Sequence, residues 1–267
     1  MKKYISFFRI RFVTGLQYRM VMVSALTTQV FWGLLEVLAY YALWQSESLA
    51  FPMQFQSVVT YIWLKEGLFA LINTWGADDD TSQIFLDGGI AYEMCRPLSI
   101  YGMWFSRSFA GRLSEATLRS IPIFLVALLV PAPFRISAPV SIPAFFLFLL
   151  TMLLGLFLVL AFCMLVYVLC FFTISPKGWR MVLTGAVELL SGSMLPLPFF
   201  PEQIRNILEL LPFAAMHNVA FLIYTGELTG TAMYRSIALQ VFWLITLVAA
   251  GQLICRHAQR RVVVQGG

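Results

Sequence analysis

Charge is the scarcest property of this chain. Only 12% of its 267 residues are Asp, Glu, Lys or Arg, and 60% are hydrophobic, whereas a soluble domain is about 25% charged and about 45–50% apolar. The mean hydropathy is +0.82. This deficit of charge excludes one large soluble core and favours a protein that crosses a membrane several times. The basic residues flank apolar runs and form no patch, so we expect no nucleic-acid partner.

Residues that build metal, redox and nucleotide sites are also few. The two histidines and four cysteines have no zinc-ligand spacing, and the sequences C-x-x-C and H-E-x-x-H are absent. We therefore expect small buried cysteines, no disulfide, and neither a metal nor another cofactor in this chain. The phosphate-binding sequence G-x-x-x-x-G-K-[ST] is absent too. Any coupling to ATP hydrolysis must then come from a partner.

Six apolar runs are long enough to be considered as membrane spans. A transmembrane helix needs about 20 mostly apolar residues, because the hydrocarbon layer is roughly 30 Å thick. Lipid offers no partner to loose backbone groups, so the runs predict helices and an all-α polytopic membrane protein. The predicted spans are residues 20–44, 56–75, 116–131, 142–173, 181–200 and 236–255.

The basic residues are distributed asymmetrically over this predicted topology. With a cytosolic N-terminus, 14 of the 18 Lys and Arg residues fall on the cytosolic side. Arg135, Arg205 and Arg235 fall outside, and Lys65 lies within a span. The positive-inside rule therefore predicts a multi-pass protein of the cell (inner or plasma) membrane with both termini in the cytosol.

The N-terminal segment and the section after the second span differ from the predicted spans. Residues 1–19 mix basic residues with Ile and Phe, which predicts an amphipathic helix lying on the lipid surface. Residues 76–115 are polar and contain "LDGGIAYEMCRPLSIYG". Gly88-Gly89 predicts a turn, followed by a short helix from Ile90 that ends before Pro97. Docking into a groove of a soluble partner and a plain solvated loop are both compatible with this pattern.

The faces of that short helix differ in polarity. One side is apolar and the other is charged; the apolar residues are Ile90, Ala91 and Met94, and the charged ones are Glu93 and Arg96.

The fifth span is interrupted by prolines. Pro196, Pro198 and Pro201 cannot continue a helix, because each lacks a donor and clashes with the preceding turn. The following "PEQIRNILELLP" has apolar residues at helical spacing, namely Ile204, Ile207, Leu208 and Leu211. We expect a broken fifth span with a re-entrant outer helix in residues 201–235. The alternative is an extracellular loop carrying one surface helix.

Four charged residues fall within the predicted spans: Glu36, Lys65, Glu66 and Glu188. Each would cost about 2.5–3.5 kcal/mol at the bilayer centre, so each should face protein or water. Lys65 and Glu66 point about 100° apart on a helix and should not pair side by side. We expect Glu36 or Glu188 to pair with Lys65. These charges either line a transport pathway or form structural pairs, and the structural role is favoured for Lys65 and Glu66.

The order of these features resembles the permease subunits of type-2 ATP-binding-cassette (ABC) exporters. The shared features are a basic amphipathic N-terminal helix, six spans, and a cytosolic G-x-I-x-x-x-x-x-R-P-x-S stretch from Gly88 to Ser99. The fifth span also breaks into SG-x-x-x-P-x-x-x-x-P, Leu211-Pro212 follows, and the tail ends RR-x-x-x-QGG.

The resemblance implies half of an ATP-driven exporter. Two permeases, identical or sister subunits, would form the pathway in the lipid, and two cytosolic ATPase subunits would bind ATP and magnesium. A coupling helix would contact the ATPase, as would the N-terminal helix. The expected residues of the coupling helix are Asp87, Gly88, Gly89, Ile90, Tyr92, Glu93, Met94, Arg96 and Pro97. The expected outer-lid residues are Pro196, Pro198, Pro201, Leu211 and Pro212.

Two other classes compete with the exporter. A secondary transporter working without an ATPase should have repeats or broken helices in both halves, and only the second half has a break. A membrane-embedded lipid-modifying enzyme could use the acidic run at residues 78–80 with Asp87. A D-D-x-x-D motif would, however, need a carboxylate where Ser82 or Gln83 stands.

Overall fold

The computed structural model describes residues 2–17, 19–46, 51–74, 89–95, 98–172 and 176–260. Every element assigned in these ranges is helical, as predicted. In chain order they are α1 (Lys2–Gly15), α2 (Arg19–Ser46), α3 (Phe55–Gly67), α4 (Phe69–Ile72), α6 (Ile90–Met94), α7 (Ile100–Leu129), α8 (Ile142–Leu169), η1 (Cys170–Phe172), α9 (Pro176–Leu190), η2 (Leu197–Phe199), α10 (Glu202–Leu208), α11 (Asn218–Thr225) and α12 (Gly230–Gln259).

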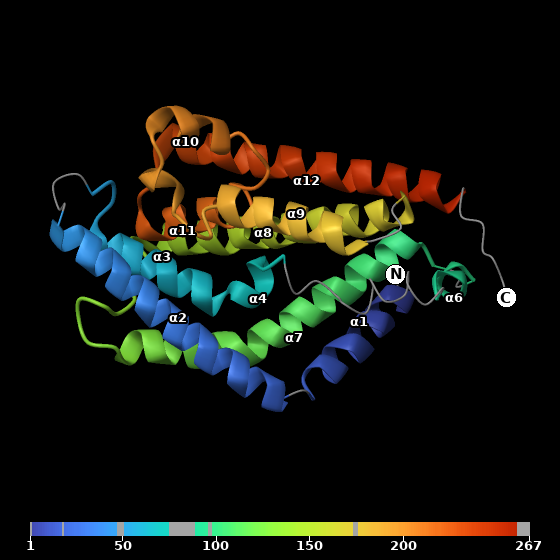
Figure 1. The fold of residues 1–267 in the computed structure, drawn as a ribbon, viewed down its shortest axis with the longest axis horizontal. Helices are drawn as coiled ribbons and strands as arrows, with labels where there is room; N and C mark the ends of the chain where they lie inside the picture. Colours follow the sequence, from blue (N-terminus) through green and yellow to red (C-terminus); the bar gives the residue numbers. More distant parts are fainter. Residues whose placement is uncertain are drawn as a thin grey trace.

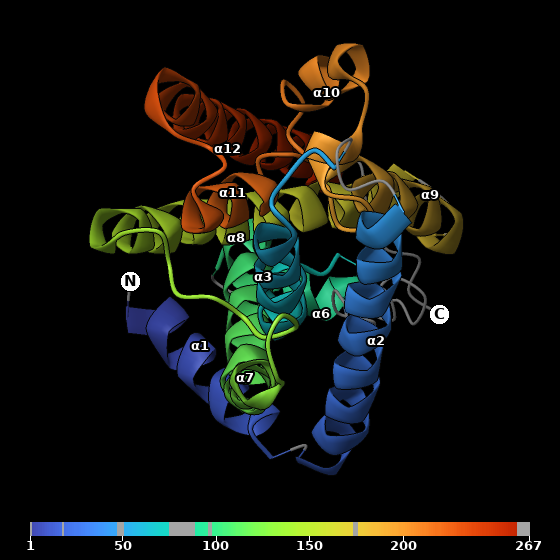
Figure 2. The same ribbon diagram turned by 90° about the vertical axis from the view of Figure 1, so that its left-hand side faces the viewer.

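The molecule has two distinct ends (Figure 1). At one, called the α6 end, lie α6, the starts of α1 and α7, and the end of α12. At the other, called the α10 end, lie α10, the end of α2 and the start of α12. Figure 2 looks from the α10 end and shows α3 lying between α2, α7 and α11.

Helix α8 is the central packing element. It has no charged residue and begins where the Ser141 hydroxyl accepts a hydrogen bond from the Ala144 amide at 3.2 Å. It packs against α12, α11, α7 and α9, and most of its second half is buried. An apolar, largely buried helix of this length therefore organises the bundle around itself.

Among the described residues, two helices are long and apolar enough to cross a membrane: Ile142–Phe172 and Gly230–Gln259. The first is mostly buried in the protein, whereas few residues of the second are buried. The structure thus contains elements compatible with membrane association. The second predicted span, residues 56–75, is divided at Leu68 into α3 and the four-residue α4. The fifth, residues 181–200, corresponds to α9, which ends at Leu190.

Helix α7 begins at Ile100, sixteen residues before the predicted start of the third span at residue 116. Its first half falls in the section 76–115, which was predicted to be polar, and contains Arg107 and Arg112. Both arginines are at least nine-tenths buried, so they face protein and do not end the helix. The Ser99 side chain caps the helix by accepting from the Gly102 amide at 3.3 Å.

Helix α1 packs alongside this first half of α7. The Tyr4 and Ser99 hydroxyls are 3.1 Å apart, and the rings of Phe8 and Phe109 are 5.4 Å apart. A helix is therefore present in the predicted N-terminal segment, and part of its apolar surface is turned to α7. Several other apolar side chains remain exposed, including Ile5 and Ile10.

Gly155 sets the closest approach between α8 and the segment that precedes α11. A Cβ atom added at Gly155 would lie only 1.9 Å from the backbone carbonyl oxygen of Met216. We predict that Gly155→Ala forces these segments apart and costs about 1–3 kcal/mol of stability, as overpacking does. Thermal unfolding of the purified protein in detergent measures this as a lower melting temperature.

Gly111→Ala is the matched control. Gly111 also lies in a long helix, but a Cβ there meets nothing within 4 Å. Alanine favours helix over glycine by up to about 1 kcal/mol, so this variant should be unchanged or more stable. Equal melting temperatures for both variants would contradict the proposed packing at Gly155.

Candidate functional site

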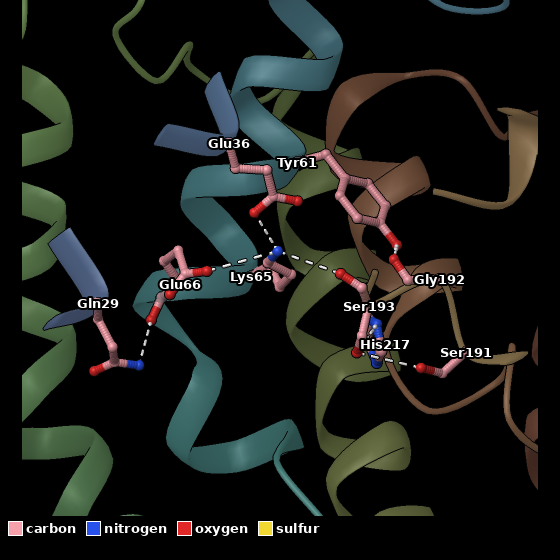
Figure 3. Close-up of polar contacts among 9 residues, drawn as sticks. All are labelled: Gln29, Glu36, Tyr61, Lys65, Glu66, Ser191, Gly192, Ser193 and His217. Carbon is pink, nitrogen blue, oxygen red and sulfur yellow. Dashed lines mark hydrogen bonds and ion pairs between the residues drawn. The ribbon is translucent and has the colours of Figure 1, made fainter. Parts of the chain in front are cut away.

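A buried polar cluster joins α2 and α3 to the chain that follows α9 (Figure 3). Helix α2 contributes two of its side chains, helix α3 contributes three, and the remaining members come from the segments after α9 and before α11. The cluster consists of Gln29, Glu36, Tyr61, Lys65, Glu66, Ser191, Gly192, Ser193 and His217.

Lys65 is the centre of this cluster. Its ammonium group forms a short ion pair with Glu36, lies 3.6 Å from a carboxylate oxygen of Glu66, and donates to the Ser193 carbonyl at 3.2 Å. The side chains of Lys65, Glu36 and Glu66 are only 9%, 15% and 4% exposed. The predicted pairing of Lys65 with Glu36 is confirmed. The expectation that Lys65 and Glu66 do not pair was wrong, because their long side chains bend towards each other.

The cluster contains more carboxylates than cations, because both Glu36 and Glu66 surround the single ammonium group of Lys65. Glu188, half-buried on α9, lies near enough to act electrostatically on Glu66. Three of the predicted intramembrane charges thus meet directly, and the fourth lies in the same neighbourhood. Gln29 adds a bond across α2 and α3, since its amide donates to the Glu66 backbone carbonyl at 3.4 Å.

This cluster binds the chain after α9 at Gly192, a glycine with left-handed backbone conformation. Gly192 has φ = +88°, and a Cβ there would lie 2.8 Å from the Tyr61 hydroxyl. That hydroxyl is 3.0 Å from the Gly192 carbonyl and 3.0 Å from the Asn218 side-chain oxygen. Ser193 is 3.3 Å from a ring nitrogen of the buried His217. Glycine is required because only it adopts this backbone at such close range.

The predicted outer lid is built on this held segment. Pro196 and Pro201 precede η2 and α10, Pro198 lies within η2, and Leu211 and Pro212 form the turn after α10. Each proline stands where a helix begins or breaks, as expected. The segment predicted to form the lid also contacts α2 and the residues after it, because Phe199 packs against Tyr40 and Phe51 with ring centroids 5.2 and 5.1 Å apart.

The segment that returns into the bundle is α11 and not α10. Residues 214–224 are all buried, whereas Ile204 and Ile207 on α10 are 47% and 62% exposed. Of the apolar face predicted on α10, only Leu208 is buried and Leu211 is half-buried. The difference has a physical cause: α10 carries charged residues, while the 213–225 segment is apolar with small alanines that permit close packing.

The predicted coupling segment is described in part. Asp87, Gly88, Arg96 and Pro97 lie outside the described residues. The amides of Tyr92 and Glu93 donate to the Gly89 carbonyl at 3.1 and 3.3 Å, which starts α6 at the predicted place.

The side chains of α6 face in different directions. Glu93 is 8% exposed and accepts a hydrogen bond from the Trp104 indole of α7 at 3.2 Å. Ile90 packs against the neighbouring hydrophobic cluster, whereas Met94 is 36% and Tyr92 is 80% exposed. The apolar side predicted from Ile90 and Met94 is therefore only partly covered. Glu93 faces the protein because the indole supplies a buried donor for its carboxylate.

Two further buried polar residues, which sequence patterns did not identify, also hold segments together by donating hydrogen bonds to backbone carbonyls. The Arg112 guanidinium of α7 donates to the carbonyls of Ala70, Leu71 and Asn73 at the end of α4. The fully buried Gln240 of α12 donates to the carbonyls of Thr151 and Ala215 at 3.2 and 2.8 Å. A lone polar residue inside an apolar run is the sequence signal that could have found Gln240.

Lys65→Met should destabilise the protein, because it leaves buried carboxylates without their cation. Removing one partner of a buried ion pair typically costs about 3–5 kcal/mol. Adding Glu36→Gln and Glu66→Gln to this variant should recover part of the loss. The measurement is the melting temperature of each purified variant in detergent.

Arg205→Ala provides the control for that series. Arg205 and Glu209 form an exposed pair at 3.8 Å, and such pairs contribute about 0–1 kcal/mol. An unaltered melting temperature in Lys65→Met with loss of transport would contradict the structural role and favour a pathway-lining charge.

Comparison with protein-family models and with curated proteins finds no match for this chain.

Proposed function

We propose that this chain is the membrane-spanning subunit of an ATP-driven ABC exporter. It crosses the cell membrane six times with both termini in the cytosol, and it forms half of a translocation pathway with a second, identical or sister, permease. ATP and magnesium bind to separate cytosolic ATPase subunits. The chain itself carries no catalytic site.

The outward faces of the helices support a lipid environment. Buried positions of α2 recur on one stripe that includes Gly33, Val37 and Tyr40. The opposite side carries large exposed apolar residues: Phe31, Trp32, Leu35, Leu38 and Leu43. Helix α12 is similar, with Val241, Phe242, Ile245 and Leu253 exposed. Apolar surface on the outside of long helices suits lipid or another permease and not water.

The geometry of α6 is the observation that carries the proposal. A short helix at the α6 end is anchored through Glu93 to Trp104, and Trp104 itself is fully buried. Tyr92 projects from that anchored helix with 80% of its surface exposed. A rigidly held helix with a protruding aromatic side chain is well suited to dock into a groove of another protein, where tyrosine is often a hot spot.

The opposite end supports the other half of the proposal. The segment from Ser191 to Tyr224 breaks, turns and returns into the bundle, and we propose that its short elements close the outer end of the pathway. The buried cluster around Lys65 holds that closure against α2 and α3. A closed outer end and a docking helix at the inner end are the two parts that an ATPase-driven exporter requires.

The direct test is purification of the tagged chain from its native membrane, with identification of the proteins that remain bound to it. A stable complex containing two permeases and two ATPase subunits is expected. The buried charges around Lys65 also suit ion-coupled transport by the chain alone. Ion-driven substrate uptake in vesicles that contain only this chain would therefore overturn the ABC proposal.

Tyr92→Ala should weaken ATPase binding by about tenfold or more, because truncation of a hot-spot aromatic costs about 2 kcal/mol or more. Pull-down of the ATPase by detergent-solubilised permease measures the change. Tyr234→Ala is the matched control, since Tyr234 is 67% exposed near the start of α12 at the α10 end. Equal binding by the two variants would argue against α6 as the docking element.

A further inference from the structure

Two adjoining cavities lie between α1, the start of α7 and the end of α12. Tyr101, Gly102 and Gln252 line both of them. Their volumes are about 190 and 320 Å³. Together they form one groove at the α6 end, distinct from the Lys65 cluster and from α6 itself.

The larger cavity is mainly apolar. Tyr4 contributes to it from α1, Phe105 from α7 and Val248 from α12. This cavity opens to the outside between α1 and α12. Such a space fits a hydrocarbon chain better than a polar metabolite.

The smaller cavity is polar and basic. Arg256 and Gln259 line it from the last turns of α12, and Ser99 lines it from the start of α7. Arg256 makes no hydrogen bond or ion pair with the described residues. Val248 lies eight residues before Arg256, about 12 Å along the helix at 1.5 Å per residue. The charged part and the apolar part of the groove are thus arranged in sequence along α12.

Two further observations point to an anionic occupant. The Tyr101 hydroxyl is buried and has no hydrogen-bond partner among the described residues, and Tyr101 is only 7% exposed while lining both cavities. No residue that lines either cavity is acidic. Helices α1 and α12 contain no Asp or Glu at all, although both carry arginine. The surroundings of the groove are therefore basic without local neutralisation.

We propose that this groove binds one anionic phospholipid of the cytosolic leaflet. The phosphate lies against Arg256 and within reach of the polar groups of the smaller cavity, and an acyl chain descends past Val248 and Phe105. This inference rests on the proposed membrane topology, in which Arg256 directly follows the last span and so lies at headgroup depth. The bound lipid would then fill the space between α1 and α12.

The test is native mass spectrometry of the full purified chain in mild detergent. The probes are phosphatidylglycerol, phosphatidylcholine with the same acyl chains, and glycerol 3-phosphate. The wild type should retain one phosphatidylglycerol in preference to phosphatidylcholine. Arg256→Ala should weaken this binding by about tenfold, as loss of a charge-assisted hydrogen bond does. Val248→Trp should fill the apolar cavity and weaken binding of both lipids.

Arg235→Ala is the matched control, because it removes the same charge from the exposed first turns of α12, away from the groove. It should bind phosphatidylglycerol like the wild type. Equal retention of both lipids by the wild type, equal losses in Arg235→Ala and Arg256→Ala, or binding of glycerol 3-phosphate as tight as that of the lipid would each overturn the inference. Because the chain is tested without an ATPase, lipid binding and ATPase binding can fail independently.

Discussion

Backbone carbonyls at helix breaks inside the bundle impose the main constraint on this structure. A carbonyl removed from water and left unpaired costs free energy, and lipid cannot supply the missing donor. Helices end after Ile72 and after Leu190, and a new helix begins at Asn218. At each break a side chain from another helix donates to the carbonyls: Arg112 after α4, Lys65 and Tyr61 after α9, and Gln240 before α11.

This arrangement explains why a chain so poor in charge keeps several charged residues in its interior. Arg112 and Lys65 each satisfy carbonyls that an apolar side chain would leave unpaired. The acidic partners of Lys65 then neutralise the ammonium group, so the ion pairs follow from the need for a donor. The cost of burying these charges is offset by backbone groups that would otherwise be unsatisfied. The broken helices and the buried charges are therefore parts of one solution.

Sequence patterns predicted the elements whose signal is local. The apolar runs located α2, α8 and α12, the prolines located the break after α9, and the need for a countercharge paired Lys65 with Glu36. The errors concern residues whose environment is set by distant partners. In the sequence Arg107 and Arg112 have the pattern of solvated residues, yet both lie on α7 and are buried in the protein. Glu93 turns inward because Trp104 offers a donor, and no spacing rule contains that information.

The anchors also form a continuous series of contacts between the two ends of the molecule. Glu93 of α6 holds the Trp104 indole, and the Trp104 ring packs against Tyr167 and Phe171 at centroid distances of 6.3 and 6.1 Å. The same helix α8 that carries Tyr167 meets the Met216 carbonyl at Gly155.

From there the series reaches the segment after α9. His217 follows Met216 and contacts Ser193, whose carbonyl accepts from Lys65. Helix α8 is a single, well-packed helix that joins these two groups of contacts. Coupling in an exporter needs an element whose position both ends can bias. In the proposed exporter α8 is suited to that role, since it touches both the α7 partner of α6 and the segment that precedes α11.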